Sequence, residues 1–85
     1  MAKYTVTISR KAQKYLDKLP DNIAEPILSA VASLKNNPRP HGYKKLTGRD
    51  VYRVRVGNYR IIYEIFDKTL VVEVIDLGHR KEIYG

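Results

Sequence analysis

The chain has 85 residues and a formal net charge of +7, which suits one small basic domain, residues 1–85, with a single core and an anionic partner. It contains no cysteine, which excludes disulfides and thiolate metal sites, and its two histidines are too few to indicate a zinc site. No apolar run approaches the roughly 20 residues of a membrane-spanning helix, and the N-terminus does not resemble a signal peptide, so we expect a cytoplasmic protein without a membrane partner.

Residues 4–8 alternate polar and apolar side chains and are rich in β-branched residues, which predicts a short strand. Ser9 stands where an N-cap would open a helix that runs to about Lys18. Pro20 is expected to end this helix, because proline disfavours helical geometry in the residue before it.

A second helix is expected to follow at once. Asn22 and Glu25 have the spacing of a capping box, which places its start near Asn22. Its apolar stripe consists of Ile23, Ile27, Leu28, Val31 and Leu34. Residues 36–42 contain two prolines and a glycine and are predicted to form a loop.

The remaining segments at 43–46, 51–56, 59–66 and 70–77 have strand character. Gly57-Asn58 separates two alternating runs, which predicts a β-hairpin with a two-residue turn. Such a turn determines the register. The expected cross-strand pairs are Val56–Tyr59, Arg55–Arg60, Val54–Ile61, Arg53–Ile62 and Tyr52–Tyr63.

This register divides the hairpin into two faces, because directly opposed residues point to the same side. The apolar face is expected to join the core and carries Tyr52, Val54, Val56, Tyr59, Ile61 and Tyr63. The other face gathers Arg53, Arg55 and Arg60, and like charges that face each other across strands cost stability. The arginines therefore indicate an anion that this face binds, and a solvated face with splayed side chains is the alternative.

The last strand is expected to follow a two-residue turn at Asp67-Lys68, which would place Val72 opposite Tyr63 and Glu73 on the arginine face. Glu64 and Glu73 are interpreted as ion-pair partners of the arginines. The element order is strand, helix, helix and four strands. It predicts an α+β fold in which two N-terminal helices pack on a small, mainly antiparallel β-sheet.

The positive charge is concentrated in residues 35–60, which hold eight basic side chains and one acidic side chain, whereas the rest of the chain is balanced. Such a segment is typical of proteins that bind a polyanion. An anionic membrane surface or an acidic protein that masks the segment would be alternatives. Lys44, Lys45 and Arg49 belong to this segment and are interpreted mainly as general electrostatic contacts.

Cleavage of RNA without a metal needs a base near the 2′-hydroxyl, cations around the phosphate and an acid for the 5′-oxygen. Arg53, Arg55 and Arg60 can supply the cations. Arg80 would join them if the tail follows the last strand onto this face. The sequence has no phosphate-binding or dinucleotide-binding glycine signature, so we expect no cofactor and no metal.

The tail offers two further candidates. Tyr84 has a ring on which a base can stack, and imidazoles transfer protons near neutral pH, which makes His79 a candidate for that step. The alternatives are a packing role for His79, a core anchor for Tyr84 and a solvated charge pair for Arg80 and Lys81.

Together these motifs resemble the RelE toxins of prokaryotic toxin–antitoxin modules, within the wider RelE/ParE superfamily. The resemblance rests on the element order, on Lys-Leu-Thr-Gly at 45–48, on the hairpin at 52–60, on Tyr63 and on the tail at 78–84. It implies a ribosome-dependent endoribonuclease that enters the A site of the 70S ribosome and cuts messenger RNA beside ribosomal RNA. It also implies a small cognate antitoxin, which neutralises the toxin in a hetero-oligomeric complex and through which operator DNA is bound.

The resemblance implies roles for single residues. Arg60 matches the family's phosphate-contacting arginine, Arg80 the arginine proposed to protonate the leaving oxygen, and Tyr84 the tyrosine that stacks on a base. Arg53 and Arg55 stand where some RelE toxins carry lysines, one of which is proposed as the base. Arginine stays protonated in proteins, so a base role for Arg53 is not expected. The alternatives to Arg53 as the base are His79, Tyr84 or an in-line geometry imposed by the ribosome. The remaining contacts with RNA or the ribosome are assigned to Lys44, Lys45, Arg49, His79 and Lys81.

Two other functions remain open. ParE-type toxins share the fold but poison DNA gyrase, and they generally lack this arginine set and the terminal tyrosine. A non-catalytic RNA-binding module would also suit aligned arginines and a stacking tyrosine. A translation assay that detects truncated messenger RNA and a gyrase supercoiling assay separate the three.

Overall fold

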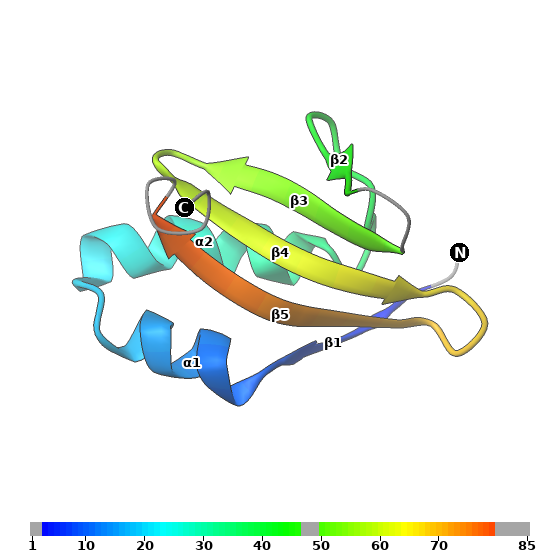
Figure 1. Ribbon diagram of the computed structural model, residues 1–85, viewed down its shortest axis with the longest axis horizontal. Helices are drawn as coiled ribbons and strands as arrows, with labels where there is room; N and C mark the ends of the chain where they lie inside the picture. Colours follow the sequence, from blue (N-terminus) through cyan, green and yellow to red (C-terminus); the bar gives the residue numbers. More distant parts are fainter. Residues whose placement is uncertain (1–2, 47–49, 80–85) are drawn as a thin grey trace.

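The computed structural model describes residues 3–46 and 50–79, in which one strand is followed by two helices and four strands (Figure 1). The elements are β1 (Thr5–Ile8), α1 (Arg10–Asp17), α2 (Asp21–Ser33), β2 (Lys44–Lys45), β3 (Val51–Val56), β4 (Tyr59–Phe66) and β5 (Val71–His79). One five-stranded sheet has the order β1-β5-β4-β3-β2. β1 is parallel to β5 and the other pairs are antiparallel, which confirms the predicted fold class.

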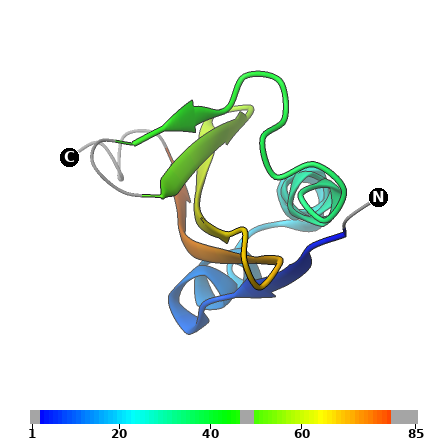
Figure 2. The same cartoon turned by 90° about the vertical axis from the view of Figure 1, so that its right-hand side faces the viewer.

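Both helices and one face of the sheet share a single core. Figure 2 shows the sheet curving around α2. Buried side chains of α1, α2 and the three long strands form one cluster, which includes Leu16, Ile27, Tyr52, Ile61 and Val74. The opposite face of the sheet, the outer face, has no described helix packed on it.

The β3–β4 hairpin has the predicted boundaries and the predicted register. Every expected pair from Tyr52–Tyr63 to Val56–Tyr59 is present. Gly57 has a φ of +59°, which suits the tight turn because glycine adopts positive φ without a steric penalty. Tyr52, Ile61 and Tyr63 are buried on the helix side, so the assignment of the apolar face is confirmed.

The start of α1 is as expected, because the Ala12 amide donates a hydrogen bond of 3.2 Å to the Ser9 hydroxyl. The capping box predicted for α2 is wrong. The helix starts at Asp21, because the Pro20 carbonyl already accepts hydrogen bonds from the amides of Ile23 and Ala24.

The predicted apolar stripe of α2 also needs one correction. Ala24, Ile27, Val31 and Leu34 are buried, whereas Leu28 is 45% exposed. Leu28 lies at the edge of this stripe, where the helix surface turns away from the sheet.

The register of β5 differs from the prediction by two residues. The turn spans residues 67–70, so Tyr63 lies opposite Val74 and Ile65 opposite Val72. A shift by two keeps each side chain on its expected face, because strands alternate with a period of two. A β-bulge near Ile75 then changes the alternation, and Ile61 lies opposite Leu77.

Candidate nucleic-acid interface

The outer face brings Arg55 and Arg60 together as a directly opposed pair on β3 and β4. Arg53 lies two residues earlier on β3, on the same face, opposite Ile62. Arg55 is exposed and Arg53 is half-buried. The predicted grouping of the three arginines on one face is therefore present in the structure.

Arg60 departs from the expectation of an accessible cation, because its residue is only 3% exposed. Its cross-strand neighbour in β5 is Gly78, which is also buried. Glycine has no side chain, so Gly78 adds no side chain to this face beside Arg60. Within the pair, Arg55 is the guanidinium that solvent reaches first.

β2 adds two exposed lysines at the edge of the sheet. Lys44 lies opposite Arg53, so it extends the cations of the outer face. Lys45 lies opposite Tyr52, and its ammonium is 3.8 Å from an Asp50 carboxylate oxygen. Of the two predicted lysine contacts, Lys44 is thus the one beside the arginines.

His79 does not join the arginines. It lies opposite Tyr59, whose ring centre is 5.4 Å from the imidazole at an angle of 84°, and the backbone amide of His79 donates to the Tyr15 hydroxyl at 3.1 Å. Tyr59 and Tyr15 pack against the core on the helix side. The bulge in β5 explains this placement, because it reverses the alternation that would have put His79 on the outer face. The alternative of a packing histidine fits its position.

Four other predicted contacts, Arg49, Arg80, Lys81 and Tyr84, lie outside the residues that the structure describes. Their assignments stay predictions.

Arg39 has a role that sequence reasoning missed. Its guanidinium lies 3.0 Å from an Asp67 carboxylate oxygen, donates to the Tyr52 hydroxyl at 3.2 Å, and sits 5.2 Å from the centre of the Tyr52 ring. The Tyr4 hydroxyl donates to the same carboxylate at 2.7 Å. The Asp67 hydrogen bond is the main reason that the pKa of Tyr4 is raised. Arg39 therefore joins distant parts of the chain instead of adding to the anion-binding charge, and no local sequence signal marks such a contact.

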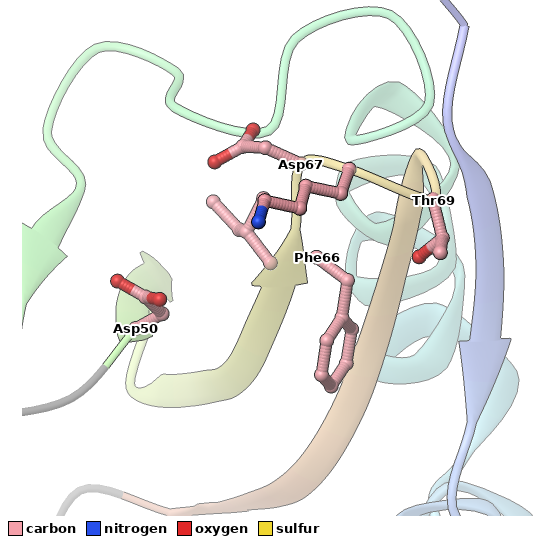
Figure 3. Close-up of a pocket in the computed structure, with 6 residues that line it drawn as sticks. Asp50, Phe66, Asp67 and Thr69 are labelled. Atoms are coloured by element: carbon pink, nitrogen blue, oxygen red, sulfur yellow. The ribbon is translucent and has the colours of Figure 1, made fainter.

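One pocket lies away from the arginines, at the turn between β4 and β5 (Figure 3). It has a volume of about 370 Å³ and is lined by Asp50, Ile65, Phe66, Asp67, Lys68 and Thr69. Arg60 and Phe66 stand near opposite ends of β4, about 20 Å apart at the usual rise of a strand. The candidate interface therefore does not coincide with this pocket.

Residues 3–46 and 50–79 contain no group of three or more histidine, cysteine or acidic side chains that could hold a metal ion. No helix in these ranges is both long and apolar enough to cross a membrane.

The chain is similar to known toxins over almost its whole length. A family model described as the ParE toxin of the type II toxin–antitoxin system parDE matches residues 6–84. Toxin RelG of Mycobacterium tuberculosis is 32% identical over 85 residues, which cover 95% of each chain. The mRNA interferase toxin RelE of Escherichia coli is 27% identical over 86 residues, which cover 96% of this chain and 90% of that protein.

A solved structure of an archaeal RelE–RelB complex from Pyrococcus horikoshii has the same fold. Its matching chain aligns with a TM-score of 0.83 and 33% identity, over 92% of this chain and 96% of that chain. The agreement in sequence and in topology extends across both helices and the sheet. The chain therefore belongs to the RelE/ParE superfamily of toxins from type II toxin–antitoxin systems.

Proposed function

We propose that this toxin is a ribosome-dependent endoribonuclease that cuts messenger RNA in the ribosomal A site. The observation that carries the proposal is the cross-strand pair of Arg55 and Arg60 on the outer face, with Arg53 beside it. Clustered guanidinium groups repel one another and suit a phosphodiester that neutralises them. Relatives named mRNA interferase support the same activity.

In the proposed reaction, the 2′-oxygen of a nucleotide attacks the adjacent phosphorus and the bond to the 5′-oxygen breaks. The 2′-hydroxyl loses a proton and the leaving oxygen gains one. The exposed Arg55 and the half-buried Arg53 stabilise the negative charge that develops on the phosphate oxygens, and the resemblance proposes the same role for Arg60. They do not remove the proton, because arginine stays protonated. Following the resemblance, Arg80 is proposed as the acid and Tyr84 as the ring that stacks on a base.

No base is assigned within the chain. The His79 imidazole packs against Tyr59 on the helix side, which argues against it as the base. An in-line arrangement of the 2′-oxygen, the phosphorus and the leaving oxygen on the ribosome would supply much of the rate by itself.

We also propose that the toxin acts in the cytoplasm and is neutralised by a small cognate antitoxin. Several similar solved structures are complexes of a RelE toxin with its antitoxin. In such a pair, operator DNA would be bound through the antitoxin.

Poisoning of DNA gyrase is the second candidate function, because the matching family model is described as a ParE toxin. This function would not need the outer-face arginines to meet an RNA phosphate. The loss of Arg55 should therefore impair a nuclease, whereas it need not impair a gyrase poison.

The test is a reconstituted translation system in which primer extension maps cuts in the messenger RNA. We expect the wild-type chain to cut on ribosomes, and Arg55→Ala to slow cutting by at least about tenfold, since one charge-stabilising donor contributes 10²–10³ in other enzymes. Arg10→Ala removes an exposed arginine from α1 and is the matched control. Arg55 is preferred to Arg60 for this purpose, because truncation of the buried Arg60 would also change stability.

Intact messenger RNA together with inhibited supercoiling by gyrase would favour the second candidate. Cutting that is unaffected by Arg55→Ala would mean that the outer-face arginines are not the site.

A further inference from the structure

Tyr43 stands at the edge of the sheet with one side of its ring supported and much of it open to solvent. It is 40% exposed, and its ring centre lies 5.8 Å from that of Tyr52 at an angle of 48°. Tyr52 stacks on Tyr63 at 5.9 Å and 25°, and both of these tyrosines are buried. The exposed ring is therefore backed by a row of fixed aromatic side chains.

The backbone also presents this ring in a defined position. The Tyr43 amide donates to the Pro40 carbonyl at 3.0 Å, and Gly42 between them has a φ of +88°. A type II turn requires positive φ at this position, which glycine adopts without a steric penalty. The turn places Tyr43 directly before β2, so ring and strand are oriented together.

Cations lie next to the ring. Lys44 and Lys45 follow Tyr43 and are exposed. Lys44 faces Arg53 across the β2–β3 pair, as Arg55 faces Arg60 across the β3–β4 pair. Lys44 therefore carries the positive charge of the outer face to the exposed edge of the sheet, beside the Tyr43 ring. An exposed ring with exposed ammonium groups beside it suits a ligand that has both a base and a phosphate.

We propose that Tyr43 and Lys44 bind one nucleotide of single-stranded RNA, with the base stacked on the Tyr43 ring and the phosphate paired with the Lys44 ammonium. Exposed aromatic rings beside cations are how proteins hold single strands without reading their sequence. Since Lys44 lies on the outer face and Tyr43 on the side of Tyr52, the strand rounds the edge of the sheet at β2. The inference rests on the proposed RNA-directed function and adds a contact outside the arginine group.

The test compares the wild type with Tyr43→Leu, Tyr43→Phe and Lys44→Ala. Phe66→Leu is the matched control, because Phe66 is also 40% exposed but stands at the far end of β4. Fluorescence anisotropy measures binding to a short labelled single-stranded RNA. Calorimetry measures binding to inorganic polyphosphate, which is a polyanion without bases.

We expect Tyr43→Leu to weaken RNA binding by about 5- to 150-fold, the range found for loss of one stacked base, and to leave polyphosphate binding unchanged. Tyr43→Phe and Phe66→Leu should bind RNA like the wild type, and Lys44→Ala should weaken both ligands. The proposal is overturned if the wild type does not bind the RNA, if Tyr43→Leu keeps wild-type affinity for it, or if that variant loses affinity for both ligands equally. The last result would indicate a charge or folding effect.

A second measurement does not depend on a folded variant. Photocrosslinking of the wild type to RNA that contains 4-thiouridine, read by mass spectrometry, should label the peptide with Tyr43. Crosslinks that are found only in other peptides of the chain would overturn the inference.

The inference and the proposed function fail separately. A wild type that binds RNA through Tyr43 but leaves messenger RNA intact on ribosomes would overturn the nuclease and keep the contact. If the wild type cuts messenger RNA but Tyr43→Leu keeps wild-type affinity for RNA, the nuclease is kept and the Tyr43 contact is overturned.

Discussion

The Tyr63 hydroxyl ties the loop after α2 to the centre of the sheet. The residue is fully buried, and its O–H donates to the Pro38 carbonyl oxygen at 2.7 Å. Burial raises the pKa of Tyr63 to about 12, because the phenolate would lose its hydration. One buried hydrogen bond thus anchors the loop that carries Arg39 and leads to Tyr43.

We expect Tyr63→Phe to lower the free energy of unfolding by about 1–3 kcal/mol, since the buried Pro38 carbonyl loses its donor. Urea denaturation followed by circular dichroism measures the change. Tyr59→Phe, on a half-buried ring, is the control and should cost less. Equal losses in the two variants would contradict this account of the hydrogen bond.

The raised pKa of Tyr63 also has a consequence at alkaline pH. The folded-state pKa of about 12 exceeds the ordinary value of 10.0, so this group's contribution to stability is complete below pH 10 and declines as the pH rises toward 12. Denaturation between pH 9 and 12 should therefore show a steeper loss of stability in the wild type than in Tyr63→Phe.

Asp67 links three segments that are distant in sequence, through Arg39 and Tyr4. Its pKa is lowered, first by the hydrogen bond from Arg39 and second by that from Tyr4. A depressed pKa means that the stabilising contribution is present above the ordinary value of 3.8 and is lost as the pH falls through the folded-state pKa.

We therefore expect the wild type to lose stability below about pH 4, and Asp67→Asn to lose less over the same range. Denaturation midpoints between pH 7 and pH 2 provide the measurement. Arg39→Met should have the same effect, and the double variant should add little to either single variant, because both remove one interaction. Lys68→Met is the control, because it also removes one positive charge near Asp67. It should retain the wild-type pH dependence. Additive effects of the two single variants would argue against the pair.

At the scale of elements, β4 divides adjacent side chains between two environments. Ile61 is fully buried on the helix side, whereas Ile62 is half-buried on the outer face. We expect Ile61→Ala to cost about 2–5 kcal/mol of stability, because it leaves a cavity in the core, and Ile62→Ala to cost clearly less. Thermal and urea denaturation test the difference. A larger loss for Ile62→Ala would mean that the two faces of the hairpin are reversed.

The β-bulge in β5 decides which side chains reach each face near the end of the strand. Without the extra residue at Ile75, continued alternation from the Tyr63–Val74 pair would place Asp76 opposite Ile61, in the core. With it, Leu77 is buried there instead. The same bulge places Gly78 beside Arg60 and turns His79 toward Tyr59. One local irregularity thus removes the imidazole from the candidate interface.

For the whole molecule, the net charge of +7 favours an acidic partner. We expect the cognate antitoxin to have an acidic toxin-binding segment that is at least partly disordered alone and folds on contact. Its association rate should fall with salt more than its dissociation rate rises, since steering is screened over about 8–10 Å at physiological salt. Stopped-flow binding across a salt series measures both rates. An association rate that is indifferent to salt would exclude the basic surface as the first point of contact.

Much of this arrangement could be predicted from the sequence because it depends on local rules. A two-residue Gly57-Asn58 turn permits one register, and that register alone places Arg55 opposite Arg60. Alternation then assigns Tyr52 and Ile61 to the core. Ser9 and Pro20 delimit α1 through capping and backbone geometry, which also act over a few residues.

Only the tertiary structure decided the features that depend on contacts between distant segments. The burial of Arg60, the pairing of Arg39 with Asp67 and the side taken by His79 each follow from how strands and loops meet in space. Residue type and spacing carry no signal for them, because the same arginine suits a phosphate or a carboxylate equally well. The sequence by itself determined which residues share a face, and packing determined which of those cations remain accessible to a ligand.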